Sequence, residues 1–262
     1  PKTGYHFVDL EKSAGDCGSV RELMELYKQT LDYFMGLQVE TEHINDEIHI
    51  QQDINAFRSS LVYDCIERAM DLVEGGSVYS ADGGPTAGTI SAGDSLAALD
   101  EIVFNQKLLT MEQVLHAMNT NYEDMDTVPS GPEIRAILVN KAPKFGNDDE
   151  RADKWVVELE DYIGSSYRYK YRSSKYGKGP VPCCYSYSQS PVTGNIAFGK
   201  SIGATPDGRK DGQPVNNGIS PANGSEKNGA TAACNSVMKL PSIWFQKGAI
   251  FNMRLSKGAL DT

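Results

Sequence analysis

The sequence has 262 residues, of which 40% are hydrophobic and 23% charged, and its formal net charge is −10 at pH 7. This is the composition of an ordinary globular domain, and its acidity disfavours nucleic acid or an anionic membrane as a general partner, because both attract positive charge. No apolar run reaches the roughly 18 residues of a membrane span, and we expect no signal peptide.

The first quarter of the chain predicts helices. Ser19 is a candidate N-cap, Glu22 completes a capping box, and apolar residues follow at helical spacing as far as Leu37. Two more helices are predicted, over about 45–53 and over 61–73.

Residues 77–105 combine a short strand at 77–80, a glycine-rich turn at 81–88 and a helix from about 91 to 105. Strand, glycine turn and helix in this order are typical of an α/β fold. The turn lacks the GxxxxGK[ST] pattern, so a tight turn beneath a packed helix is favoured over a phosphate-binding loop.

The middle of the chain predicts a helix capped by Thr110, a shorter one over 132–139, and a long one from about 146 to 164. Acidic residues in the first turn of the long helix suit the helix dipole and lack the alternation of a calcium loop. His43 and Glu47 share a helical face from which His49 is displaced, so a surface helix is favoured over a metal site.

The segment SSYRYKYRSSKYGKG, residues 165–179, is basic with interleaved tyrosines. That composition is typical of a nucleic-acid patch. The overall acidity of the chain favours a solvated helix end and connector instead.

The last third predicts one or two strands within 181–202, including a strand at 192–202, and then a sharp turn at Thr205–Arg209. A loop rich in Gly, Asn, Pro and Ser follows at 212–229, then a helix at 230–240 and a buried strand at 249–255. The predicted fold class is therefore α/β. We expect one partial domain, 1–262, truncated at both ends, because the chain opens without Met and stops soon after an apolar segment.

The five cysteines form an odd, scattered set without CxxC spacing: Cys17, Cys65, Cys183, Cys184 and Cys234. This pattern predicts reduced thiols in the cytoplasm and no zinc or iron–sulfur site. The sequence also lacks GxSxG, so a serine hydrolase is not supported.

Four segments carry a family resemblance: GGSVYSADGGPTAGTISAGDSLAAL (75–99), KAPKFGNDDERAD (141–153), GATPDGR (203–209) and GISPANGSEKNGATAACNSVMKL (218–240). In this order they resemble the glycyl radical enzymes, the pyruvate formate-lyase-like superfamily that includes glycerol dehydratase and hydroxyproline dehydratase-like members. The resemblance implies part of a ten-stranded α/β barrel surrounded by helices. It also implies a central cysteine loop and a glycine loop, a radical installed by a radical-SAM activase, and a homodimer when full length.

The catalytic motifs of that family, Gly-Cys-Val/Ala and Arg-Val-x-Gly-Tyr/Phe, are absent from this chain. We therefore expect a fragment that lies between the two catalytic loops, holds no catalytic residue and is inactive alone. Pyruvate formate-lyase itself has two adjacent cysteines at its active site. Cys183 and Cys184 are also adjacent, but their flanking residues, Pro182 and Tyr185, do not match that pair. The implied reaction is radical C–O, C–N, C–S or C–C cleavage of a small molecule, of the dehydratase, lyase or formate acetyltransferase type. The alternative is a non-catalytic α/β interaction domain that retains the barrel sequence.

By analogy with the relatives, the start of the strand before TPDGR lines the substrate pocket. The substrate-binding candidates are Ser190, Val192, Thr193 and Asn195, with barrel packing as the alternative role. We expect Gly203 and residues 206–209 to set a loop, with Arg209 paired to a carboxylate rather than to substrate.

Overall fold

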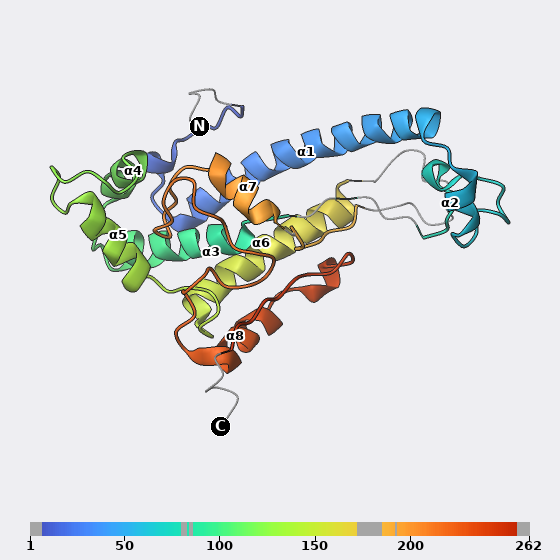
Figure 1. Ribbon diagram of the computed structural model, residues 1–262. Helices are drawn as coiled ribbons and strands as arrows, with labels where there is room; N and C mark the ends of the chain where they lie inside the picture. The colour runs from blue at the N-terminus through green and yellow to red at the C-terminus, as the bar shows by residue number, and fades with distance from the viewer. Residues whose placement is uncertain (1–6, 80–82, 84–85, 172–184, 192, 256–262) are drawn as a thin grey trace.

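A computed structural model describes residues 7–79, 83, 86–171, 185–191 and 193–255, which form an array of helices around a central pair, α3 and α6 (Figure 1). The α-helices are α1 (Val20–Gln52), α2 (Ala56–Ser60), α3 (Thr89–Ala98), α4 (Met111–Asn119), α5 (Gly131–Asn140), α6 (Glu150–Tyr169), α7 (Gly194–Ser201) and α8 (Gly229–Met238). Short helices of other types are η1 (Ala14–Asp16), η2 (Leu72–Glu74), the π-helix η3 (Leu99–Asn105) and η4 (Ser242–Trp244).

Within these described ranges no strand forms, and β pairing is limited to isolated bridges, such as the parallel bridge between Gln189 and Ala249. The predicted strands at 77–80 and 249–255 are therefore wrong where they are described: residues 77–79 form a bend, and only the 249 end of the second segment pairs. The barrel is not confirmed by these residues alone. Parallel strands need neighbours on both sides, and such neighbours come from distant segments.

The long helix α1 begins as predicted, because the Ser19 side chain accepts a hydrogen bond from the Glu22 backbone N–H. The expected capping box is only half formed, since the Glu22 carboxylate accepts from Gly18 N and from Lys12. The helix predicted at 45–53 is the last part of α1 and not a separate element. In Figure 1, α1 runs past the central helices and ends beside α2.

The helix predicted at 61–73 is wrong. Asp64 and Ala69 have positive φ angles of 74° and 50°, which interrupt a right-handed helix. The Asp71 carboxylate instead accepts hydrogen bonds from Asn55 N at 2.9 Å and Ser59 Oγ at 2.8 Å, so the segment folds back on α2 as turns.

The core lies where α3 and η3 pack on α6, with α4, α5 and the start of α1 around them. Gly93 allows the closest approach, because a Cβ at that position would lie 2.4 Å from Val156 Cγ2 and 3.1 Å from Val156 Cα. The fully buried side chains of this core include Met24, Ile102, Val114, Ile134, Leu138 and Leu159.

A charge cluster joins α8 to the start of α6. Lys239 Nζ lies 2.7 Å from Asp153 Oδ2 and 2.8 Å from Asp148 Oδ1, and Ser236 Oγ donates to the same Asp153 oxygen at 2.9 Å. Asp153 is fully buried, and burial raises its pKa despite these partners. The ammonium of Lys239 is therefore the cation that compensates a buried carboxylate.

We expect Lys239→Met to lower the free energy of unfolding by about 3 kcal/mol, because the change leaves the Asp153 carboxylate without its cation. Urea unfolding of the 262-residue chain measures the loss. The matched control is Asp148→Asn, which removes a half-exposed partner of the same lysine and should cost less than about 1 kcal/mol. Equal losses for the two variants would contradict the assignment.

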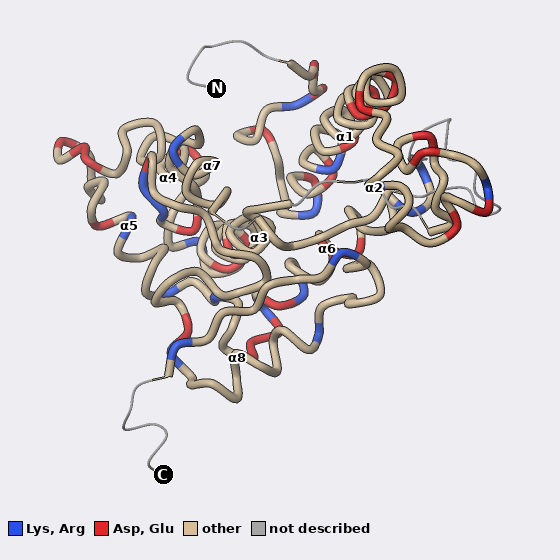
Figure 2. The backbone as a smooth tube through the Cα atoms, turned by 45° about the vertical axis from the view of Figure 1, so that its right-hand side comes forward, with Lys and Arg blue, Asp and Glu red and all other residues tan. Residues whose placement is uncertain are grey.

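The basic segment 165–179 is described only as far as residue 171, where it forms the end of α6. Lys170 pairs with Asp32 at 2.8 Å, and Tyr167 is buried. Figure 2 shows blue basic and red acidic positions interspersed along the described chain. These contacts favour the helix-end interpretation over a nucleic-acid patch; residues 172–179 lie outside the described ranges.

None of the described helices combines the length and apolar character that crossing a membrane requires. The predictions of helices over 91–105, 132–139, 146–164 and 230–240, and of the Thr110 cap, are confirmed within a few residues at their ends.

Candidate functional site

The segment with the predicted substrate contacts is not a strand, because residues 194–201 form α7. The turn begins when Gly194 N donates to Pro191 O at 2.7 Å. In a strand, alternate side chains would face inward, with a period of two residues. A helix has a period of 3.6 residues, so that alternation does not apply beyond Thr193. Ser190 is half-buried beside Gln189, Thr193 is exposed at the start of α7, and Val192 lies outside the described residues.

Asn195 has a packing contact within the described chain. Its side-chain amide donates to Val215 O at 3.4 Å, and Val215 N donates to Asn195 O at 3.2 Å. These bonds fix α7 to the 213–215 segment, where Gly199 leaves no room for a Cβ. A role in substrate binding stays a prediction for Ser190, Thr193 and Asn195.

Next to Ser190 lies a buried polar cluster. It brings together Thr89 of α3, Glu160 of α6, and Tyr187 and Gln189 of the segment before Ser190. Tyr187 OH donates to Glu160 Oε2 at 2.6 Å, and Gln189 Nε2 lies 2.9 Å from Glu160 Oε1. The same nitrogen lies 2.6 Å from Thr89 Oγ1 and 2.8 Å from Tyr187 OH. All four side chains are buried, and Glu160 and Gln189 are fully so.

Burial raises the pKa of Glu160 to about 7, against the lowering effect of hydrogen bonds from Tyr187, Gln189 and Thr89. Burial and the neighbouring Glu160 carboxylate also raise the pKa of Tyr187. Perturbed carboxyls gather at functional sites, although structural networks perturb them too. The cluster can therefore hold or release a proton near neutral pH.

Backbone hydrogen bonds tie this cluster to three other segments. Gln189 N donates to Gly248 O at 3.2 Å, Ile250 N donates to Gln189 O at 3.0 Å, and Ile219 N donates to Ile250 O at 2.9 Å. On the other side, Thr86 N donates to Ser188 O at 2.9 Å. The segments around 86, 189, 219 and 250 thus lie side by side, joined by backbone hydrogen bonds.

The TPDGR segment forms the predicted turn, with Gly208 at φ 93° and its N–H donating to Thr205 O at 3.0 Å. Arg209 folds back into its own loop. Its guanidinium donates to the backbone carbonyls of Ile202, Gly203, Lys210 and Gln213, and its side chain also bonds Thr205 Oγ1. Within the described residues, Arg209 caps carbonyls and does not form the expected pair with a carboxylate.

Three other segments hold this loop from outside: the turn after α4, helix α5 and the loop between α5 and α6. Tyr122 OH donates to Thr205 O at 2.7 Å, Arg135 Nε to Gly208 O at 2.8 Å, and Lys144 Nζ to Asp207 O at 2.8 Å. Donors from three places converge on backbone carbonyls, so TPDGR is a structural turn.

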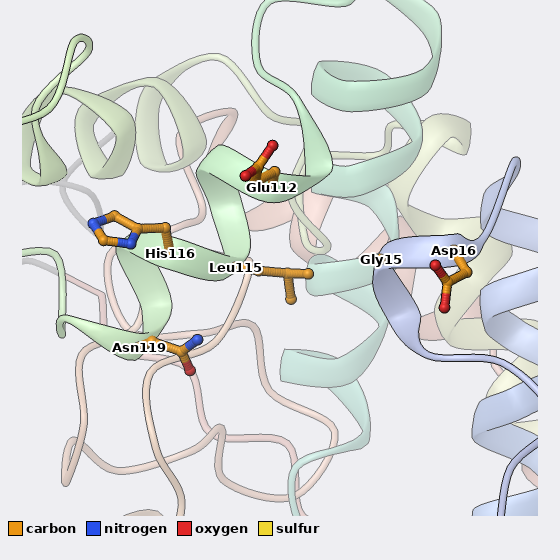
Figure 3. Close-up of a pocket in the computed structure, with 6 residues that line it drawn as sticks. All are labelled: Gly15, Asp16, Glu112, Leu115, His116 and Asn119. Carbon is orange, nitrogen blue, oxygen red and sulfur yellow. The ribbon is translucent and has the colours of Figure 1, made fainter.

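A surface hollow of about 480 Å³ lies elsewhere, between η1 and α4 (Figure 3). Leu115 points across it towards Gly15, and His116 pairs with Asp124 at 2.6 Å. Its lining is Gly15, Asp16, Glu112, Leu115, His116 and Asn119. The hollow is open and brings no candidate residue of the sequence analysis together.

The residues described contain no group of three or more His, Cys, Asp and Glu side chains that could hold a metal ion. His49 pairs with Asp53 one turn along α1. Cys17 and Cys65 are buried, which raises the pKa of both thiols, and Cys234 is half-buried on α8. Cys183 and Cys184 lie outside the described residues.

Comparisons place this geometry among known proteins. The family model Pyruvate formate lyase-like matches residues 2–198. The chain is 33% identical over 99% of its length to "Probable dehydratase YbiW" of Escherichia coli K12, and 32% identical over 93% to trans-4-hydroxy-L-proline dehydratase of Clostridioides difficile. It covers 32% and 29% of those proteins. The glycerol-bound B12-independent glycerol dehydratase of Clostridium butyricum superposes with a TM-score of 0.82 at 32% identity, over 95% of this chain and 31% of that one.

Proposed function

The chain belongs to the pyruvate formate lyase-like family of glycyl radical enzymes, and we propose that it is part of the large domain of a radical dehydratase or lyase. The observation that carries the proposal is the similarity over nearly the whole chain to a probable dehydratase, at 33% identity. The chain spans about a third of the length of the curated relatives it matches.

The proposed reaction is radical cleavage of a C–O, C–N, C–S or C–C bond in a small molecule, or formate acetyl transfer. Within the complete protein, a glycyl radical on a residue outside this chain, installed by a radical-SAM activase, would supply hydrogen-atom abstraction. No described cysteine is assigned to that chemistry in the proposal, because none lies in the Gly-Cys-Val/Ala context of the family's catalytic loop. The contribution of this chain is to pack, to exclude water and to position.

Three groups of residues make that contribution in the proposal. The α3–α6 pair forms a dense wall in which Val156 and Ile90 are fully buried. The Arg209 loop fixes the connection after α7. Residues 188–195 present Ser190, Thr193 and Asn195, the proposed substrate contacts, beside the Glu160 cluster. A homodimer, a cytoplasmic location and an anaerobic setting belong to the same proposal.

The second candidate is a non-catalytic interaction domain with a retained family sequence. It draws on the lack of both catalytic motifs in this chain. Sequencing the gene in both directions distinguishes the two. A Gly-Cys-Val/Ala motif upstream and an Arg-Val-x-Gly-Tyr/Phe motif downstream are the expected result. A reading frame that ends at both sides without them would overturn the enzyme proposal and favour the interaction domain.

A further inference from the structure

We propose that Glu160 is a positioning residue. The side-chain amide of Gln189 takes one of two orientations, according to whether Glu160 carries a proton. This orientation sets how the 188–191 and 248–250 segments pack. The link to substrate contacts at Ser190 and Thr193 rests on the proposed function. The switch itself is a property of the buried cluster.

The first observation is an imbalance of hydrogen bonds at Gln189. Its Nε2 has two hydrogens and lies within 2.9 Å of three oxygens, on Thr89, Tyr187 and Glu160. Its Oε1 is buried with no hydrogen-bond partner. A buried acceptor without a donor costs about 1–3 kcal/mol, so an ionised Glu160 must offset that cost by accepting the amide hydrogen.

The second observation is what a proton on Glu160 would change. A neutral carboxyl has an O–H that needs an acceptor, and at Oε1 this O–H would face the amide N–H of Gln189. Turning the amide by half a revolution brings Gln189 Oε1 into reach of two donors, the Glu160 O–H and the Thr89 hydroxyl. The two protonation states therefore favour opposite amide orientations.

Glu160 is the group in direct contact with the Gln189 amide whose charge varies near neutral pH. No cation is among the influences on its pKa, which are burial, Tyr187, Gln189 and Thr89. Two other buried carboxyls lie on the packed elements: Asp153 pairs with Lys239, and Asp94, whose pKa burial also raises to about 7, accepts a hydrogen bond from Phe145 N. Glu160→Gln leaves both in place, so it separates their titration from that of Glu160. Of the remaining groups, Tyr167 OH donates to Gln38, Tyr185 OH to Val39 O and Lys247 Nζ to Gly83 O.

The third observation is the route from the side chain to the backbone. Gln189 N and O both bond the 248–250 segment, and Ile250 O accepts from Ile219 N. Gly218 fits between them so closely that a Cβ there would lie 2.3 Å from Ile250 O. A shift of Gln189 therefore reaches both neighbouring segments through short, tightly packed contacts.

The direction with pH follows from the raised pKa of Glu160, about 7. The folded chain binds this proton more tightly than the unfolded chain. The contribution of Glu160 to stability is therefore complete below the usual glutamate pKa and is lost as pH rises to about 7. We therefore expect the segments around residues 189, 219 and 250 to be most stable on the acidic side of neutrality.

Hydrogen exchange of the Gln189, Ile219 and Ile250 backbone amides in the 262-residue chain tests the proposal, between about pH 5.5 and 8.5 and corrected for intrinsic exchange. Their corrected opening should increase at least tenfold as pH rises from about 5.5 to 7, and should level off above that pH. In Glu160→Gln, which imitates the neutral acid, the same amides should show no such step. An unchanged step in Glu160→Gln, or no step in the natural sequence, would overturn the proposal.

A second variant keeps the test decisive if Glu160→Gln does not fold. Tyr187→Phe removes a hydroxyl that donates to the carboxylate, so the pH at which opening levels off should move higher. If that pH is the same in Tyr187→Phe as in the natural sequence, the proposed link between Glu160 and the 248–250 segment is wrong. Neither readout uses enzymatic activity, so a failure here is distinct from a failure of the proposed function.

Discussion

Replacing Arg209 with alanine is expected to lower the free energy of unfolding by about 3–5 kcal/mol. The guanidinium, in a residue only 8% exposed, donates to four backbone carbonyls of its own loop. Alanine removes the donor to the Gly203 and Gln213 carbonyls, leaves the Ile202 and Lys210 carbonyls with only their backbone donors, and opens a cavity in place of the buried guanidinium. Chemical denaturation monitored by circular dichroism measures the loss.

Two companion variants make the Arg209 result specific. Arg209→Lys keeps the charge, but a single ammonium cannot reach all four carbonyls, so we expect an intermediate loss. Arg151→Ala removes an exposed guanidinium paired with Asp149 and Glu101, and should cost less than about 1 kcal/mol. If Arg209→Ala cost no more than Arg151→Ala, the capping role would be wrong.

Gly93→Ala is expected to lower the free energy of unfolding by about 1–3 kcal/mol. The added methyl group would overlap Val156 Cγ2 and approach the α6 backbone at Val156, so α3 must move away from α6. Thermal and urea unfolding of the variant measure the effect.

The opposite sign is expected at Gly36, where a Cβ would meet nothing within 4 Å and the residue lies inside α1. Gly36→Ala should stabilise the chain by roughly 1 kcal/mol, because alanine favours the helix. A rescue completes the design: Val156→Ala should cost less in the Gly93→Ala background than alone, since the two sites share one space. Additive effects would show that the contact is not the cause.

The elements that the sequence predicts well are those with a local cause. Ser19 and Thr110 cap helices through hydrogen bonds within three residues, and Gly208 takes the positive φ that its turn requires. The helix predicted over 61–73 fails because Asp64 and Ala69 adopt positive φ, and because Asp71 bonds Asn55 and Ser59, which lie outside the segment. Hydrophobic spacing cannot register such contacts.

The segment 192–202 shows a second limit. Its apolar and small residues fit either period, and α7 is held by contacts of Asn195 and Gly199 with the 213–215 segment. Pairing with distant chain decides between helix and strand there. The predicted strand is wrong for that reason, so the alternation of a strand does not show which side chains of this segment face the pocket.

The buried cluster was missed, although one of its members carried a signal. Glu160 lies four residues after Val156 and four before Gly164, on the buried face of α6. A carboxylate on an apolar stripe indicates a buried partner. Nothing local identifies that partner as Tyr187 or Gln189, because the chain returns to Glu160 only through the folded arrangement of α3, α6 and the 185–189 segment.

The measurement that tests the central claim most directly is electron spin resonance of the complete protein after anaerobic activation by a radical-SAM activase. The account predicts an organic radical signal that is split by a glycine α-hydrogen and that collapses when the protein is made with α-deuterated glycine. No radical signal in a sample whose activase demonstrably cleaves its cosubstrate, or a signal that glycine deuteration leaves unchanged, would contradict it.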